Sequence, residues 1–490
     1  MKIFLINVRR SENPLIPLGL LYLGGVLERN GYKVKVYDVV DPNDESQLVN
    51  EVLKYQPDVL GFSFLTTAVE KTNRIIQQLR TISGKSIFIS GGVHSTALPQ
   101  DTFERLGLDY VICGEGEVSL LEFCNSLRTG SVRRDIAGLV YREDSKVTIN
   151  PVSGYIEDLD SLPLPAWHLV DMEKYLFPPG YIKGLFYRRT APVLTSRGCP
   201  ARCIFCSSPN IFGRMVRRRS VRSVVDEIKT LKDRYRIDGV FFLDDTFTVD
   251  RNWIMDFCKL MEEERVNLDW SCQTRVNVVS REILERMKDA GCVQVDYGIE
   301  SGSAKILKNL KKGTNIEQIK TAFKLAREVG LRTYGSVLLG SPGETWSDVQ
   351  LTKKLLAELR PSLTLFNFLT PFPGSELYDM ALKNNWIRGG VDRLHSYDMH
   401  TTDESLMISE LSPGELSRAR SELKNKVFFQ NYLGYLNPKN LSFILEVMGC
   451  CLLHPVLILR GLRKAMRSRA FDDFSEAVYF IYCQEKRRRK

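Results

Sequence analysis

The sequence predicts an α/β protein with two successive parallel β-sheets and a helical C-terminal region. Short apolar segments alternate with segments whose apolar residues recur at helical spacing, once before residue 135 and again between residues 191 and 400. Beyond residue 400 only the helical spacing remains. We therefore expect a first sheet domain, a linker region, a second sheet domain and a basic helical region at 1–135, 136–190, 191–400 and 401–490.

The first domain has near-continuous apolar strands, which favour a parallel sheet covered by helices on both faces, of the Rossmann-like type. One helix is expected at 18–29, where Asn30-Gly31 forms a stop signal. A Gly-x-Gly-x-x-Gly sequence is missing after the first strand, and no P-loop occurs, so nothing here points to a dinucleotide or to ATP. The expected strands are 3–8, 33–38, 59–64, 86–90 and 110–113.

The second domain shows six strand–helix units, which predict an incomplete parallel barrel of the (β/α)6, TIM-like type. Chemistry in such barrels is located in the loops that follow the carboxyl ends of the strands. Helices are expected between the strands, for example at 221–235 and 316–329. The expected strands are 192–196, 239–243, 268–273, 293–299, 333–338 and 363–369.

Composition excludes several classes of protein. The chain has 490 residues, of which 43% are hydrophobic and 26% charged, as in ordinary globular proteins and unlike disordered, collagenous or coiled-coil chains. The apolar run at the start is too short for a signal peptide, and Arg9-Arg10 interrupt it. We therefore expect a cytoplasmic protein, whose eleven cysteines are thiols or metal ligands rather than disulfides.

The positive charge is concentrated at the C-terminus. The net charge is +9, and residues 411–490 alone hold 15 Lys and Arg against 7 Asp and Glu. A diffuse basic groove is thus excluded, and nucleic acid is not an expected partner. The mostly apolar segment 441–459, followed by cationic residues, predicts either a helix at the inner face of a membrane or a helix packed on the protein.

Three closely spaced cysteines form the strongest chemical signal. Cys199, Cys203 and Cys206 follow the first strand of the second domain, after Gly198. Three thiols at this spacing can converge on one metal centre. A structural zinc site normally needs four protein ligands, and no nearby fourth Cys or His is apparent. Thiolates also hold iron–sulfur clusters, and three of them would leave one iron of a four-iron cluster open. The alternative is an incomplete zinc knuckle or three unrelated thiols.

The cysteine spacing, with aromatic Phe205 just before the third cysteine, closely resembles the radical S-adenosylmethionine (SAM) superfamily over roughly residues 190–375. The resemblance implies a [4Fe–4S] cluster on the three cysteines, SAM on its open iron, and a 5′-deoxyadenosyl radical. It also implies SAM contacts after later strands; for the acidic positions, a helix cap or a solvated loop end is the alternative. These positions are Asp244, Asp245, Arg275, Glu300, Ser301 and Gly340.

The N-terminal domain resembles the cobalamin-binding domain that precedes the radical domain in one large subgroup. The resemblance rests on segment 17–23, on Gly91 and Gly92 with His94, and on Gly114 with Glu115. The Asp-x-His-x-x-Gly motif, whose histidine binds cobalt in many such proteins, is absent. The expected cofactor is therefore cobalamin without a histidine from that motif. His94 either contacts the cofactor or orients its loop.

The resemblance to this subgroup implies an enzyme, foremost a cobalamin-dependent methyltransferase that acts on an unactivated carbon. The same subgroup also contains oxidative cyclases and ring-rearranging enzymes, which are the alternative activity. A non-catalytic zinc-binding scaffold is the alternative from another class. The expected partners are a small-molecule or lipid substrate and a reductant such as flavodoxin or ferredoxin.

Overall fold

The chain divides into two compact units. Unit 1 comprises residues 1–175, 195–223 and 370–398, and unit 2 comprises 176–194, 224–369 and 399–490. The cysteine segment thus belongs to the N-terminal unit, although its sequence position suggested the second domain. The structure, a computed structural model, describes residues 1–10, 15–40, 42–152, 154–176, 182, 189–388, 391–395 and 406–435, with seven single positions between 441 and 459.

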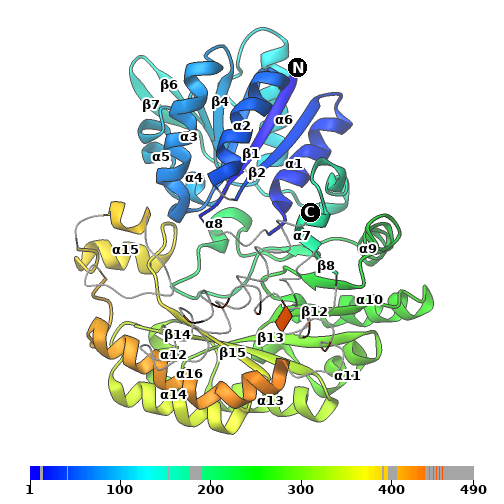
Figure 1. Cartoon of the computed structure of the whole chain (residues 1–490), viewed down its shortest axis with the longest axis vertical. Coiled ribbons are helices and arrows are strands. Elements are labelled where there is room, and N and C mark those ends of the chain that lie inside the picture. Colours follow the sequence, from blue (N-terminus) through cyan, green and yellow to red (C-terminus); the bar gives the residue numbers. More distant parts are fainter. Residues whose placement is uncertain are drawn as a thin grey trace. The chain divides into compact units, whose positions relative to one another are not determined.

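Unit 1 contains a seven-stranded sheet in the order β2-β1-β3-β4-β5-β6-β7 (Figure 1). The first five strands are parallel, as predicted, and their bounds agree with the expected segments to within one residue. They are β1 (Lys2–Val8), β2 (Lys33–Val39), β3 (Val59–Phe64), β4 (Ile87–Gly91) and β5 (Tyr110–Ile112).

Two antiparallel strands, β6 (Leu139–Glu143) and β7 (Lys146–Ile149), extend this sheet. They lie in the range that the sequence assigned to a linker, so regular structure of the first sheet continues beyond residue 135. A two-residue turn joins them, and both of its residues, Asp144 and Ser145, have positive φ. Such a tight hairpin leaves almost no turn sequence to detect.

Helices cover the sheet of unit 1. Helix α1 (Leu18–Arg29) has the predicted bounds and packs against α6 (Gly116–Arg128). Helix α2 (Pro42–Tyr55) packs against α3 (Val69–Ile82), and both contribute apolar side chains to a core with Phe4, Phe62 and Phe88 of the strands. Two short helices, α4 (Val93–Ala97) and α5 (Pro99–Arg105), follow β4.

Unit 2 contains a six-stranded, wholly parallel sheet in the order β15-β14-β13-β12-β11-β8. Strands β8 and β15 form its edges, which confirms the incomplete parallel barrel. The strands are β8 (Thr190–Val193), β11 (Gly239–Phe242), β12 (Asp269–Thr274), β13 (Cys292–Glu300), β14 (Arg332–Leu339) and β15 (Leu363–Phe368).

Helices line the outer face of this second sheet (Figure 1). Trp270 of β12 packs there against Phe242, Phe247 and Phe257, all buried. The helices are α9 (Val221–Tyr235), α10 (Arg251–Glu263), α11 (Arg281–Asp289), α12 (Ala304–Asn309), α13 (Ile316–Val329), α14 (Trp346–Leu359) and α16 (Pro413–Tyr435).

In the described part of the C-terminal region, non-helical residues 406–412 precede one long helix, α16. Among the described residues, no helix is long and apolar enough to cross a membrane. Most of the apolar segment 441–459 and all of 461–490 lie outside the described residues. A membrane-surface position for this segment therefore stays a prediction.

Candidate functional site

The cysteine loop of unit 1 is held in place by backbone contacts. It follows β9 (Ser196–Arg197), which pairs with β10 (Arg217–Arg218). Cys199 N donates to the Gly213 carbonyl at 3.4 Å, and Cys206 N donates to the Cys203 carbonyl at 3.2 Å. Cys199 is buried, whereas Cys203, Phe205 and Cys206 are half-buried. The loop thus presents three thiols within eight residues on a fixed backbone.

Gly198 is required by the geometry of this loop. Its φ is +95°, in the region that favours glycine. A Cβ atom at this position would lie 2.2 Å from the carbonyl oxygen of Met215 and 3.1 Å from that of Phe212. Both are backbone atoms, so the strand pair leaves no room for a side chain here.

A buried ion network joins the cysteine loop to the loop after β5. Glu115 Oε1 lies 3.0 Å from Arg197 Nη1, and its Oε2 lies 2.8 Å from Arg217 Nη1. Glu117 Oε1 accepts from Arg197 Nη2 at 2.5 Å, and Ile156 N donates to Glu115 Oε2 at 2.8 Å. The Glu115, Arg197 and Arg217 side chains are at most 4% exposed. Glu115, expected to bind a cofactor, thus has both oxygens engaged in positioning the cysteine loop.

The carboxyl-end loops of the first sheet combine glycines with exposed apolar side chains. Gly92 has φ +88°, and Gly114, with φ +81°, donates to Thr96 Oγ1 at 3.0 Å. A Cβ at Gly91 would lie 3.3 Å from the Ile112 carbonyl oxygen. Leu65 after β3 is 60% exposed and Val93 after β4 is 40% exposed. This edge is therefore a close-packed backbone surface with an apolar fringe, which suits a large flat ligand.

His94 takes part in a buried hydrogen bond. Its side chain is 1% exposed, and its Nδ1 lies 3.0 Å from Thr66 Oγ1. The ring packs against Phe64. Burial lowers the pKa of His94 to about 4, and the nearby His395 acts in the same direction, so the imidazole is neutral at pH 7. The loop-orienting bond expected as one of two roles is present; contact with a cofactor stays a prediction.

The acidic pair after β11 separates into two environments. Asp244 is fully buried and Asp245 is exposed. Asp244 lies close enough to the buried Cys272 to raise the pKa of that thiol, after the larger effect of burial itself. Arg275, after β12, is half-buried and donates to the Lys312 carbonyl.

The end of β13 is a strained, charged corner. Glu300 has φ +61°, which a non-glycine residue rarely adopts, and its carboxylate pairs with Lys312 Nζ at 2.6 Å. Both side chains are at most 8% exposed. A Cβ at Gly298 would lie 2.2 Å from Glu300 Oε1, so this glycine makes room for the pair. Strain of this kind is typical of functional positions.

Ser301 contributes to the local structure of the same corner. Its Oγ lies 3.3 Å from Thr352 Oγ1 on α14 and accepts from Ser303 N at 3.1 Å. A Cβ at Gly302 would lie 2.5 Å from the Thr352 Cα, so the backbone after β13 lies very close to α14. A SAM contact by Ser301 stays a prediction.

The loop after β14 encloses a buried carboxyl group. Glu344 Oε2 accepts from Gly340 N at 2.6 Å and from Ser341 N at 3.1 Å, and Gly340 has φ +85°. Glu344 Oε1 is buried without a hydrogen-bond partner among the described residues. Burial raises the pKa of Glu344 to about 7, although the two backbone bonds oppose this rise.

We expect this carboxyl group to make stability depend on pH. The folded pKa, about 7, exceeds the ordinary value of 4.5, so between these values the folded chain holds a proton that the unfolded chain releases. The contribution of this group to the free energy of unfolding should therefore fall by about 3 kcal/mol in total as pH rises from 4.5 through 7, and should level off above about pH 8. Urea unfolding at several pH values measures this slope.

Glu344→Gln should remove most of that pH dependence, because the amide does not titrate. The matched control is Glu317→Gln, at a side chain that is 82% exposed. If wild type and Glu344→Gln show the same slope between pH 5 and 7, the raised pKa is wrong.

The inner face of the second sheet is polar. Trp270 packs on the helices, so its neighbour Ser271 points to the opposite face. On β13, Gln294 Nε2 donates to Asp296 Oδ1 at 2.9 Å, and Arg332 Nε of β14 donates to Gln294 Oε1 at 3.3 Å. Among the described residues, Ser271 Oγ and Asn367 Oδ1 are buried without hydrogen-bond partners. These atoms are available to a polar ligand.

Sequence motifs located the loops, but several side chains that hold them were missed. Lys312, Arg197 and Arg217 stand outside the recognised positions, and His395 is far along the chain from His94. Their only sequence signal is a charged residue beside a glycine or a strand end, which is too common to be specific.

Comparison with known proteins identifies both halves of the chain. The B12 binding domain model matches residues 5–123, and the radical SAM superfamily model matches residues 193–356. An uncharacterised methyltransferase of Pyrococcus horikoshii is 32% identical over 92% of this chain and 93% of its own length. Cytidylyl-2-hydroxyethylphosphonate methyltransferase of Streptomyces wedmorensis is 30% identical over 76% of this chain and 78% of its own.

Solved structures show the same fold. The radical SAM methyltransferase TsrM from Kitasatospora setae superposes with a TM-score of 0.68 at 19% identity, over 90% of this chain and 89% of that one. The radical enzyme OxsB superposes with a TM-score of 0.64 at 19% identity, over 87% of this chain and 61% of the OxsB chain. With its relatives among methyltransferases, the chain is an enzyme that belongs to the radical SAM superfamily and carries a B12 binding domain.

Proposed function

We propose that this enzyme is a cobalamin-dependent methyltransferase that methylates an unactivated carbon of a polar small molecule. The observation that supports it most directly is the combination, in one chain, of a three-cysteine loop on a fixed backbone with a glycine-rich sheet edge that has an apolar fringe. Two relatives at 30–32% identity are named methyltransferases, which supports methyl transfer, although another relative at 30% identity is named a putative methylthiotransferase.

The residues of unit 1 fit an iron–sulfur cluster and a corrin. Cys199, Cys203 and Cys206 would hold the cluster, and the network around Glu115 keeps their loop in register. The backbone at Gly91, Gly92 and Gly114, with Leu65 and Val93, would receive the flat corrin ring. When bound, these groups supply an electron for the cleavage of SAM and a carrier for the methyl group.

The residues of unit 2 fit SAM and a polar substrate. Glu344 offers an unpartnered buried oxygen in the loop that carries Gly340, and Glu300, Asp244 and Asp245 offer further carboxylates after strand ends. We assign the inner-face atoms Ser271 Oγ and Asn367 Oδ1 to the substrate, since a lipid chain would leave them buried and unpaired. A site that excludes water also protects a primary radical from quenching.

The test is anaerobic incubation of the reconstituted enzyme with a reductant and SAM that carries a deuterated methyl group. We expect 5′-deoxyadenosine in wild type and at least about a hundredfold less in Cys203→Ala, because a cluster needs its thiolate ligands. Cys258→Ala is the matched control, since Cys258 is a buried thiol of α10 outside the loop. Equal 5′-deoxyadenosine from Cys203→Ala and wild type would contradict the assignment.

Following the label separates the competing activities. Polar and lipid extracts of the source cells are supplied as substrate pools in separate incubations. Deuterium in a polar product supports the proposal, whereas deuterium in a lipid overturns the polar substrate. An anaerobic magnesium-protoporphyrin IX monomethyl ester cyclase of Rubrivivax gelatinosus is 29% identical over 95% of this chain. Formation of 5′-deoxyadenosine with no deuterated product in either pool would favour a cyclase.

A further inference from the structure

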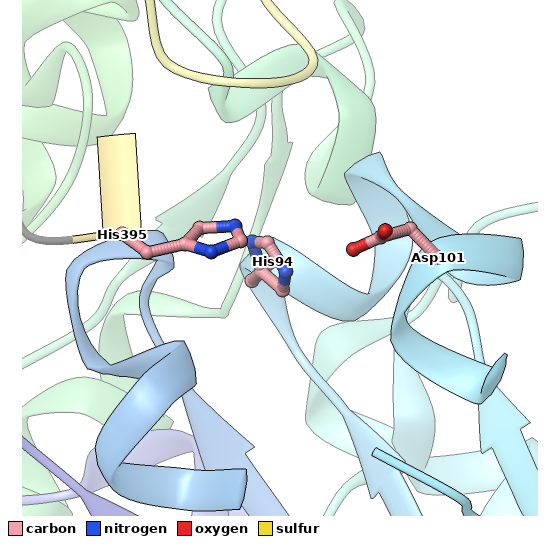
Figure 2. A group of neighbouring side chains, drawn as sticks. All are labelled: His94, Asp101 and His395. Carbon is pink, nitrogen blue, oxygen red and sulfur yellow. The ribbon is translucent and has the colours of Figure 1, made fainter. Parts of the chain in front are cut away.

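Two histidines and an aspartate meet in unit 1, away from the cysteine loop in the sequence (Figure 2). His94 is on α4, Asp101 is on α5, and His395 ends the short helical turn η6 (Val391–His395). One donor atom from each lies within 4.8 Å of the other two. Figure 2 shows the imidazole of His94 between the other two side chains. The histidines are 1% and 3% exposed.

Each histidine has one ring nitrogen fixed by a neighbour outside the group. His94 Nδ1 lies 3.0 Å from Thr66 Oγ1, and His395 Nδ1 lies 3.3 Å from Glu70 Oε1. Metal-binding histidines typically have this arrangement, in which a carboxylate or another polar group orients the ring through the second nitrogen. For His94 this leaves the Nε2 atom for a ligand.

The remaining nitrogen of His94 has no partner. His94 Nε2 is buried without a hydrogen bond among the described residues. A buried imidazole nitrogen without a hydrogen bond lowers the stability of the fold, and a bound ligand would remove this cost. The Asp101 carboxylate is held from its other side, since Arg105 Nε and Nη2 donate to it at 3.1 and 3.2 Å.

We propose that His94, Asp101 and His395 bind a structural Zn²⁺ ion. Two imidazoles and one carboxylate suit zinc better than magnesium or calcium, which prefer oxygen ligands. Ligand atoms of tetrahedral zinc lie roughly 3.4 Å apart, so small side-chain rotations close the observed spacing. Asp392 of the same turn is the candidate fourth ligand; its oxygen lies 3.9 Å from His395 Nδ1, the nitrogen that also faces Glu70, so its side chain has to rotate to reach the ion.

This ion would fasten η6 to the loop that follows β4. That loop begins at Gly92, directly after Gly91 at the end of β4, so the site would fix the edge of the sheet to which we assign the corrin. The role is structural, because both histidines are closed to solvent. It does not depend on the proposed methyl transfer and is tested without turnover.

The experiment measures metals in the full-length, cluster-reconstituted enzyme after dialysis against metal-free buffer. We expect about one zinc per chain in wild type and at least about fivefold less in His395→Gln and Asp101→Asn, with iron unchanged. Cys203→Ala should lose iron and keep zinc. His168→Gln is the matched control, since His168 is 55% exposed and pairs only with Glu28 among the described residues.

Zinc X-ray absorption identifies the ligands directly. We expect two imidazole nitrogens and oxygen, without sulfur. Zinc–sulfur scattering would assign the metal to cysteines and overturn the proposal. A wild-type enzyme that retains under about 0.1 zinc per chain after incubation with one equivalent of Zn²⁺ would also overturn it. Asp101→Asn tests the site even if His395→Gln does not fold, because asparagine preserves the size of the aspartate side chain.

Discussion

Replacing Glu115 by alanine is expected to lower the free energy of unfolding of unit 1 by about 3–5 kcal/mol, because it leaves buried guanidinium groups without their carboxylate. Arg197 keeps Glu117, but Arg217 retains only the carbonyl oxygens of Ile156 and Phe212 and the face of the Tyr155 ring among its described partners. Hydrogen exchange followed by mass spectrometry measures the effect, since it reports on α6 and on the β9–β10 pair separately.

The matched control for this variant is an exposed ion pair of the same unit. Asp135→Asn breaks a 2.7 Å contact with Arg133, and both side chains are more than half exposed. Its effect on the free energy of unfolding should be small beside that of Glu115→Ala, because water screens an exposed pair. We also expect less iron per chain in Glu115→Ala, because the cysteine loop follows Arg197 directly. If Glu115→Ala lowers the free energy of unfolding by less than about 1 kcal/mol, water reaches the buried ion network around Glu115.

Gly198→Ala should abolish cluster assembly while leaving all three cysteines in place. The new methyl group would lie 2.2 Å from a backbone oxygen, in a region of φ where alanine is already strained. Both oxygens belong to the backbone between the cysteine loop and β10, so relief of the clash requires that backbone to move. Iron per chain should fall to the level of Cys203→Ala, as measured by metal analysis and visible absorption.

Gly31→Ala separates steric conflict from backbone strain. Gly31 also has positive φ, +81°, but nothing lies within 4 Å of its added Cβ. This variant should cost only about 1 kcal/mol and leave the iron content unchanged. If Gly198→Ala binds as much iron as Gly31→Ala, the loop is more adaptable than its contacts indicate.

The sequence predicts most of the fold because strand and helix signals in this chain are local. Asn30-Gly31 ends α1 as expected, and Asn315 with Gln318 caps α13 at the predicted start. The hairpin of β6 and β7 was missed, since its turn, Asp144-Ser145, lacks the usual glycine. The contacts of 195–223 with unit 1 are not readable from the sequence either, because which sheet a loop packs on is a long-range property.

In the candidate site, too, the residues with a local sequence signal are predictable and those that depend on long-range contacts are not. Cys199, Cys203 and Cys206 are recognisable because their spacing alone is specific. Partners that act across the chain are not, as the Glu300–Lys312 pair and the meeting of His94 with His395 show. Asp244 and Asp245 are adjacent in sequence, yet one is buried and the other exposed, and no pattern distinguishes them.

The course of the chain between the two units bears on how the protein is synthesised and dissected. The polypeptide passes from one unit to the other after residues 175, 194, 223, 369 and 398. A nascent chain can therefore complete its N-terminal half only after residues 370–398 have left the ribosome. A fragment that ends near residue 135 or 190 would lack those pieces, so gene truncation at the apparent sequence boundary is a poor route to an isolated vitamin-binding module.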